Sequence, residues 1–191
     1  RLASDLLFLK KYSENRVLAG TVCALCALIS VFGLGGWKLK GQYDKTVALF
    51  TQGDGDGSRY CMEAYLDRAS EYAMELSEES RQYLSDEEQA ARVEEAAMEL
   101  SAENGPVSGR YEIYRSLTRS VERLYSDLQA AGKQDEAAIA LAYGDYLSVG
   151  DLIKRDAYPE KAEAYNKTAG AFPAKLISGL WGVGQLDTFG R

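Results

Sequence analysis

Hydrophobic residues follow two patterns along this chain, one continuous and one periodic. The continuous pattern covers residues 17–37, which are 21 successive uncharged residues between Arg16 and Lys38. At a helical rise of about 1.5 Å per residue, this run spans roughly 31 Å, close to the roughly 30 Å hydrocarbon core of a bilayer. A buried core helix would show a polar stripe, and this run has none. The pattern therefore predicts a transmembrane helix over residues 17–37.

A cleavable signal peptide is the alternative interpretation of the same run. Its apolar length exceeds the usual core of about 7–15 residues, and Gly35-Gly36-Trp37-Lys38 stands where a cleavage site of small residues would be expected. We therefore expect a retained single-pass anchor. Four Lys/Arg precede the run and three follow it closely. This small difference does not decide on which side of the membrane the soluble part lies.

From about residue 41 onward, apolar residues recur every three or four positions, which is the spacing of amphipathic helices. No segment alternates with period two, so we expect no sheet. Several long helices with short connections favour an antiparallel bundle. The predicted fold class is all-α, with an N-terminal transmembrane helix followed by an antiparallel bundle of about four helices. The predicted apolar faces are Met62, Leu66, Ala69, Ala73 and Leu76; Ala90, Val93, Ala97 and Leu100; Tyr111, Tyr114, Leu117, Val121, Leu124 and Leu128; Ile139, Tyr143, Tyr146 and Ile153; and Ala162, Tyr165, Ala169 and Phe172.

Polar residues and glycines mark the predicted ends of these helices. Ser58 and Asp135 are suitable N-cap residues, and Ser85–Glu88 has the spacing of a capping box. Gly132 follows the third apolar face and predicts a helix stop there. The expected organisation is a basic segment at 1–16, the transmembrane helix at 17–37 and a helical soluble domain at 41–191.

Charge separates these parts and limits the partners. Residues 1–40 carry six Lys/Arg and two Asp/Glu, a net charge of +4, whereas residues 41–191 carry 16 and 27, a net charge of −11. An acidic body argues against nucleic acid, because phosphate neutralisation needs a basic surface. Clustered carboxylates would also be repelled by an anionic membrane. The expected partners are the lipid bilayer, through residues 17–37, and other membrane or envelope proteins.

Residues able to carry chemistry are few. The chain has no histidine, which excludes Ser-His-Asp and Cys-His catalysis and His-ligated metals. Cys23 and Cys26 have C-x-x-C spacing but lie in the apolar run, where a thiolate is disfavoured. Residues 54–58 resemble the start of a calcium loop. Its sixth position is Arg59 and its twelfth is Tyr65, where Gly and Glu are needed. We therefore predict that this segment is a hinge and binds no calcium. For the chain as a whole we predict no metal, no cofactor, no catalytic residues and no enzyme activity.

The end of the chain resembles the C-terminal signature of the LemA family. The resemblance lies in Tyr165-Asn166, Phe172-Pro173 and the segment Leu180-Trp181-Gly182-Val183. The order of elements is also similar: an N-terminal span, a Tyr-rich first helix, long helices and this tail. A central family motif is mostly absent, since residues 67–72 read Asp-Arg-Ala-Ser-Glu-Tyr, as in a divergent member. The resemblance implies a bacterial, membrane-anchored helical bundle of no assigned enzymatic activity.

Three functions remain open at this point. The first is a scaffold or interaction module at the bacterial cell envelope. The second is a regulatory or sensory adaptor that binds a small ligand in a cavity lined by Tyr143, Tyr146 and Tyr165, and the third is a membrane enzyme that uses carboxylates alone. The segment after Pro173, here called the tail, leads to a further expectation. Its apolar residues Leu176, Ile177, Leu180 and Trp181 make one strip of a short helix, which we expect to dock on its own bundle.

Overall fold

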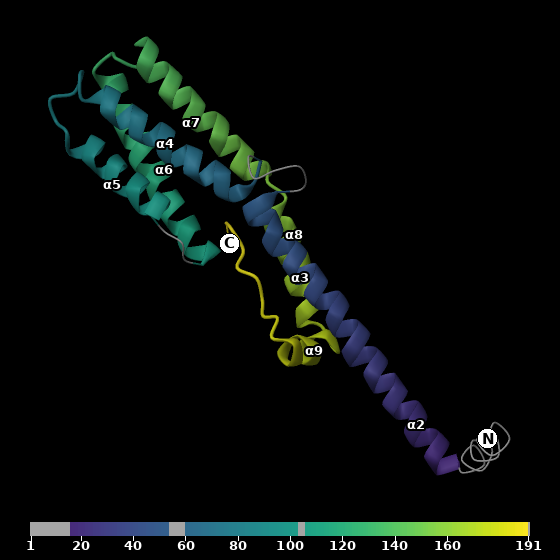
Figure 1. Ribbon diagram of the computed structural model, residues 1–191. Coiled ribbons are helices and arrows are strands. Elements are labelled where there is room, and N and C mark those ends of the chain that lie inside the picture. Colours follow the sequence, from purple (N-terminus) through teal and green to yellow (C-terminus); the bar gives the residue numbers. More distant parts are fainter. Residues whose placement is uncertain (1–15, 54–59, 103–105, 191) are drawn as a thin grey trace. The chain divides into compact units, whose positions relative to one another are not determined.

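The computed structural model describes residues 16–53, 60–102 and 106–190, and it is all-α over those ranges. This confirms the predicted fold class, because the described residues contain helices and no strand. Figure 1 shows the helices in chain order. They are α2 (Arg16–Ile29), the π-helical turn η1 (Ser30–Leu34), α3 (Gly35–Gln52), α4 (Met62–Ser80), α5 (Glu88–Ala102), α6 (Val107–Ala130), α7 (Ala137–Arg155), α8 (Tyr158–Gly170) and α9 (Ala174–Trp181).

The chain divides into two compact units. The first, here called the helix–tail unit, comprises residues 1–44 and 166–185, and the second, the bundle unit, comprises residues 45–165 and 186–191. The boundary predicted near residue 41 lies close to the first division. Residues 166–185, predicted to belong to the soluble domain, group with the N-terminal helix instead. The division also separates charge, because the helix–tail unit has eight Lys/Arg and three Asp/Glu, and the bundle unit 14 and 26.

The core of the bundle unit forms where α4 packs against α5, α6 and α7, and α5 packs against α6. Figure 1 shows these four helices side by side. The predicted apolar faces of α4 and α5 are buried throughout, as are Leu117, Val121, Leu124 and Leu128 on α6. Burying one such leucine contributes about 1.5–3 kcal/mol to folding, so this shared core holds the bundle together.

The C-terminal end of α6 follows the sequence closely. Gly132 has a φ of +69°, the left-handed conformation that favours glycine. The Gly132 N–H donates to the Gln129 carbonyl at 3.0 Å, and the Lys133 N–H donates to the Leu128 carbonyl at 2.9 Å. This pair of hydrogen bonds is the Schellman motif, and it confirms the predicted helix stop.

The N-terminal ends differ from the predictions. Ser58 lies outside the described residues, and α4 is capped by Cys61, whose sulfur accepts from the Ala64 N–H at 3.5 Å. At the start of α5, Asp86 Oδ1 accepts from the Glu88 N–H at 3.0 Å, where the capping box would have Ser85 accept this bond. The residue before α7 is Glu136 and not Asp135, and its side chain makes no capping bond. Several neighbouring oxygens compete for each helix start, so the pattern alone left the choice open.

Candidate membrane-anchoring site

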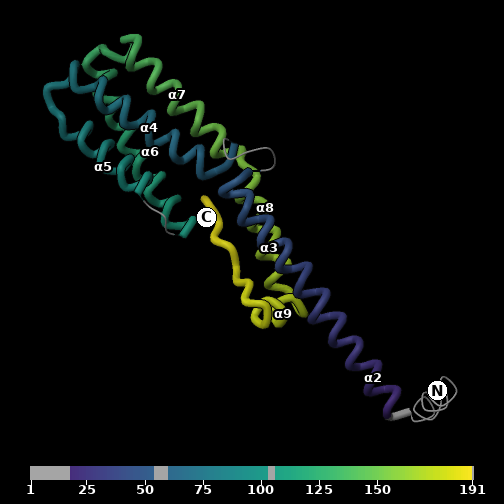
Figure 2. The backbone as a smooth tube through the Cα atoms, in the orientation of Figure 1, coloured from purple at the N-terminus to yellow at the C-terminus, as the bar shows by residue number. Residues whose placement is uncertain are grey.

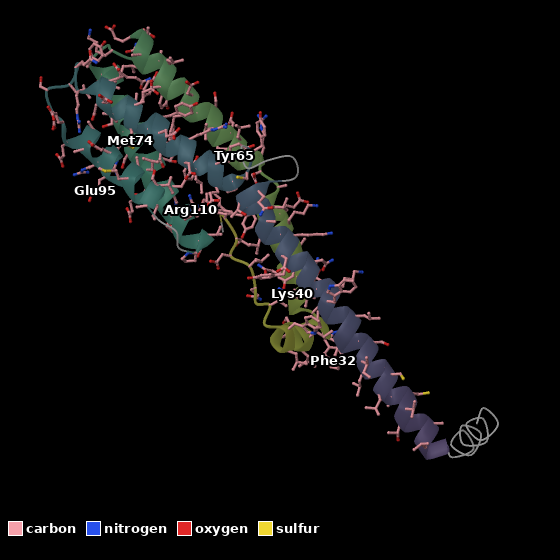
Figure 3. All side chains as sticks on the ribbon, viewed as in Figure 1. Phe32, Lys40, Tyr65, Met74, Glu95 and Arg110 are labelled. Atoms are coloured by element: carbon pink, nitrogen blue, oxygen red, sulfur yellow. The ribbon has the colours of Figure 1, made fainter. Side chains whose placement is uncertain are left out.

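The apolar helix of the helix–tail unit presents its side chains outward. Among the described residues, one helix is long and apolar enough to cross a membrane, Leu18–Gln52. None of its most apolar stretch, with a mean hydropathy of 2.1, is buried inside the protein. Leu28 is 51% exposed and Ile29 is 69% exposed, and Figure 3 shows side chains projecting from α2 along its length. The most apolar stretch of the predicted run is therefore a helical surface that the protein leaves exposed.

The tail contacts this helix through a tryptophan. The Trp181 Nε1–H donates to the Phe32 carbonyl oxygen at 2.8 Å. Phe32 lies within η1, where the Gly35 N–H reaches the carbonyls of both Ser30 and Phe32. A π-turn disturbs the regular i to i−4 ladder, so a carbonyl in it gains from an additional donor. The indole supplies that donor from the far end of the chain.

Two glycines let α9 approach this closely. A Cβ at Gly36 would overlap the Trp181 indole, and a Cβ at Gly35 would lie 3.3 Å from Ile177 Cδ1. Beyond the contact, α9 ends at Gly182, whose φ of +64° makes a left-handed helix stop. Sequence analysis treated Gly35 and Gly36 only as evidence against a cleavage site. The signal it missed was a glycine pair inside an apolar run, on a chain with a second tryptophan near its end.

The predicted docking of α9 on the bundle is wrong. Figure 2 shows the α9 turn of the tail beside the helix that contains η1, and residues 166–185 belong to the same unit as that helix. Ile177 is buried there, whereas Leu176 and Leu180 are 56% and 73% exposed. Phe172, expected to complete an apolar face, is 84% exposed. The spacing identified the apolar strip but carried no information about which surface the strip would meet.

A groove in the bundle unit is lined by aromatic and mostly basic side chains. Tyr111 and Tyr114 on α6 contact Phe189, with ring centroids 4.8 and 6.0 Å apart. The groove has a volume of about 470 Å³, and its charged lining residues are Arg115, Arg119, Lys154 and Glu122. Burial raises the pKa of Tyr114, so its hydroxyl keeps its proton at neutral pH. Such a groove suits a small ligand with an apolar body and a negative group.

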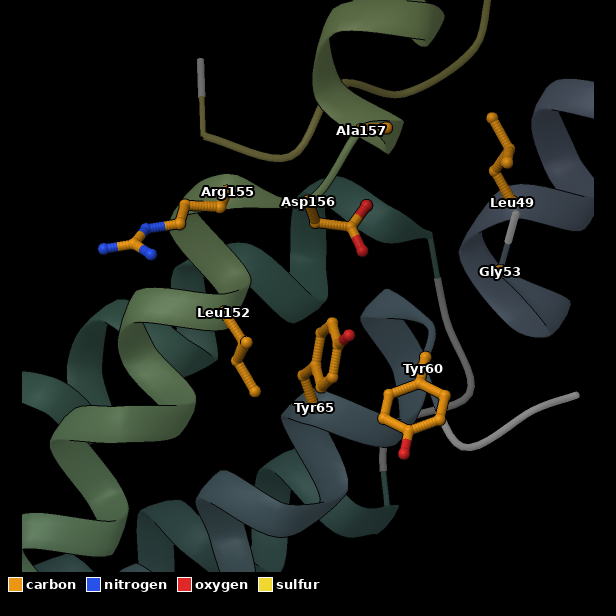
Figure 4. Close-up of a pocket in the computed structure, with 8 residues that line it drawn as sticks. All are labelled: Leu49, Gly53, Tyr60, Tyr65, Leu152, Arg155, Asp156 and Ala157. Carbon is orange, nitrogen blue, oxygen red and sulfur yellow. The ribbon is translucent and has the colours of Figure 1, made fainter. Parts of the chain in front are cut away.

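A smaller pocket of about 220 Å³ lies where α7 ends and α8 begins (Figure 4). Tyr65, Leu152 and Asp156 line it. Burial raises the pKa of Asp156, although the hydrogen bond from the Tyr158 N–H to Asp156 Oδ1, at 2.7 Å, works in the opposite direction. This bond closes the first turn of α8, which gives Asp156 a structural role at the pocket.

The three tyrosines proposed to form a ligand cavity have other surroundings. Tyr146 Oη and Thr118 Oγ1 are hydrogen-bonded at 2.9 Å. The Tyr143 ring stacks on Tyr125 with centroids 3.6 Å apart, and Tyr165 is buried on α8. None of the three lines the two pockets described above. The tyrosines that face a groove are instead Tyr111 and Tyr114, which the sequence pattern had assigned to the apolar face of α6.

A buried arginine joins α6 to α4 and was not anticipated. Arg110 is 5% exposed, and its guanidinium lies 3.2 Å from Glu63 Oε1 and 3.4 Å from Asp67 Oδ1. The guanidinium also lies over the Phe50 ring, 5.6 Å from its centroid. The side-chain label in Figure 3 marks Arg110 near the start of α6. This cluster ties helix ends together and offers no open position for a substrate.

The remaining candidates for chemistry are scattered. Within the ranges the structure describes, no three His, Cys, Asp or Glu side chains stand close enough together to hold a metal ion. The calcium-like residues 54–58, predicted to be a hinge, lie outside those ranges. Cys23 and Cys26 are exposed on α2, and the Cys61 thiol is buried and donates to the Thr51 carbonyl at 3.2 Å.

Comparison with known proteins finds no counterpart: no family model, no curated protein and no solved structure matches the chain.

Proposed function

We propose that this protein is a single-pass membrane protein whose helical bundle scaffolds or binds other components of the bacterial cell envelope. The observation that carries the proposal is the long apolar helix, none of whose most apolar stretch is covered by the protein. In water, a contiguous apolar surface of this size is a liability, whereas a bilayer covers it fully.

The distribution of charge supports the same proposal. The helix–tail unit has a net charge of +5 and the bundle unit a net charge of −12. A basic unit is attracted by anionic lipid, and an acidic bundle is repelled by it and stays in water. The resemblance to the LemA family at Tyr165-Asn166 and at Phe172-Pro173 adds the expectation of a bacterial, non-enzymatic membrane protein.

Membrane extraction tests the anchor. The full chain should remain with bacterial membranes through high-salt and alkaline washes. A variant with Leu25→Lys and Leu28→Lys should be recovered in the wash, because two charges disfavour insertion. The matched control is Leu141→Lys with Leu147→Lys, two exposed leucines of α7. Release of the unaltered chain by the alkaline wash would contradict the anchor.

Affinity capture tests the scaffold. Full-length protein should be isolated from gently solubilised membranes and its composition measured. A protein that is retained at fixed stoichiometry supports a scaffold. Capture of the chain alone, at every detergent concentration tried, counts against one.

A sensory adaptor is the second candidate, favoured by the groove at Tyr111, Tyr114 and Phe189. Its three basic residues outnumber the one acidic residue, Glu122, and would favour a small anionic ligand by charge complementarity. Native mass spectrometry of the purified chain should then reveal a bound small anion. The Arg119→Gln/Lys154→Gln variant should lose that ligand, and Arg92→Gln/Arg123→Gln serves as its control with the same change in charge.

A further inference from the structure

The tail carries an apolar face for which the protein provides no cover. Phe172 lies in the turn before α9, and Leu176 and Leu180 lie four residues apart on one side of that helix. They are 84%, 56% and 73% exposed. Ile177 and Trp181 occupy the adjacent side, which faces Gly35 and Gly36. One side of α9 therefore packs against the N-terminal helix, and the neighbouring apolar side is left uncovered.

The position along the N-terminal helix at which α9 contacts it indicates what covers the exposed side of α9. The hydrogen bond joins Trp181 to Phe32, which lies five residues before Trp37, the last residue of the uncharged run. Five residues correspond to about 7.5 Å of helix. Helices that lie in the membrane interface bury their apolar face about 5–10 Å into the boundary between headgroups and acyl chains. The contact thus lies at the depth of an interfacial helix.

Charge also fits a lipid surface. The part of the helix–tail unit that follows the span, residues 38–44 with 166–185, carries Lys38, Lys40, Lys167 and Lys175. Its only acidic residue is Asp44, which pairs with Lys40 at 3.2 Å. Taken alone, α9 has Lys175 and too little charge for an interfacial helix. The lysines grouped with it in the structure supply the charge that α9 itself lacks.

We propose that α9 and the turn before it form a second membrane contact, which inserts Phe172, Leu176 and Leu180 into the interface of an anionic bilayer beside the end of the spanning helix. The inference rests on the proposed anchor. An eight-residue helix would bind lipid weakly alone. Because α9 is held against the spanning helix through Trp181 and Ile177, its insertion is an intramolecular event at high effective concentration. The tail then fixes the depth and rotation of the span.

Quenching of tryptophan fluorescence by lipid tests this contact in the full chain. Trp37→Phe leaves Trp181 as the only tryptophan, and Trp37 is itself exposed. The protein is reconstituted into vesicles of phosphatidylcholine and phosphatidylglycerol whose acyl chains carry bromine either just below the headgroup or near the chain end. Trp181 emission should be lost mainly with the shallow bromines. The emission should be affected little by the deep ones.

Two variants separate contact of the face with lipid from mere proximity of the tryptophan. Leu176→Glu/Leu180→Glu, in the Trp37→Phe background, should lose most of the shallow quenching while the vesicles still float with the protein. Leu176→Ser/Leu180→Ser should give an intermediate loss. The control Leu141→Glu/Leu147→Glu, on exposed positions of α7, should quench like the parent. Circular dichroism verifies that each variant keeps its helices.

Each of the other possible outcomes contradicts one named part of the proposal. If the protein floats with vesicles but Trp181 is not quenched, the tail contact is wrong and the anchor stands. If quenching persists unchanged in Leu176→Glu/Leu180→Glu, the apolar face is not in lipid. Blue-shifted, unquenched emission in every variant would mean that protein covers the tail. If the protein does not float at all, the anchor itself fails.

Discussion

On α6 of the bundle unit, Leu117, Val121, Leu124 and Leu128 follow helical spacing and have no exposed surface. In the helix–tail unit, Leu176 and Leu180 on α9 follow the same spacing and are more than half exposed. The local pattern is equivalent, and the outcome differs because only the first set meets other helices. The comparison teaches that helical periodicity identifies an apolar face, while the second surface that covers it must be supplied by the fold or by the surroundings.

Charge follows the same division. The bundle unit has a closed apolar core and a net charge of −12, as expected of a domain surrounded by water. The helix–tail unit exposes its apolar residues and has a net charge of +5. In each unit, the burial of apolar residues and the net charge suit the same surroundings, which are water for the bundle unit and a membrane for the helix–tail unit.

Truncating one leucine in each unit gives the largest expected contrast. Leu124→Ala removes a fully buried side chain and should lower the free energy of unfolding of the bundle by about 2–5 kcal/mol. Leu180→Ala removes a side chain that is 73% exposed and should change it by less than about 0.5 kcal/mol. Denaturation of the detergent-solubilised chain, followed by circular dichroism, measures both. Equal costs would show that α9 belongs to the cooperative core.

A charge placed on an exposed leucine should impair membrane insertion in the helix–tail unit and leave it unchanged in the bundle unit. Leu28→Lys should disfavour membrane insertion by about 2.5–3.5 kcal/mol, because an ammonium at the centre of a span loses its hydration. Leu141→Lys on α7, also at an exposed leucine, should leave insertion unchanged. The inserted fraction of each chain, measured with a glycosylation tag in microsomes, provides the readout. Insertion of Leu28→Lys as efficient as the parent would contradict a span centred there.

How far the sequence predicts this molecule follows from the same contrast. The bundle was predictable because its faces are local: Leu66, Val93 and Leu124 stand in clear helical periods, and each is buried. Gly132 was predictable because a left-handed helix stop is a local requirement. The apolar run was visible because its length and lack of charge need no partner.

Features that depend on pairing distant segments were not predictable. The bond from Trp181 to Phe32 joins residues 149 positions apart, and nothing in the local spacing selects that partner. Arg110 lies on the same helix as several exposed charged residues, so the sequence could not single it out as the buried one. The groove at Tyr111 and Tyr114 likewise needs Phe189, which comes from the end of the chain.

The buried guanidinium of Arg110 gives a smaller test of the bundle core. Glu63→Ala/Asp67→Ala removes both carboxylate partners and should destabilise the bundle by about 1–3 kcal/mol, because a buried donor is left unpaired. Arg110→Met should cost less, because the carboxylates that remain are 39% and 55% exposed and can be hydrated. Glu71→Ala/Glu75→Ala, two exposed positions of the same helix, provides the control. A larger loss for Arg110→Met than for the double variant would reverse this account.

The smallest expected effect is a pH dependence at Asp156. Because burial raises the pKa of this carboxyl, the folded chain binds its proton more tightly than the unfolded chain does. The group therefore opposes folding fully at neutral pH, and this opposition is relieved as pH falls through the raised pKa. Asp156→Asn keeps an oxygen to accept from the Tyr158 N–H and should stabilise the bundle at pH 7. The advantage over the parent should then shrink as the pH is lowered toward the ordinary pKa value of 3.8.

Glu95→Gln, at an exposed position of α5, corrects for the loss of one negative charge from the acidic bundle. Denaturation midpoints across that pH range measure the difference, and an advantage that grows toward acid would show that the carboxylate is stabilised, not penalised, by its surroundings.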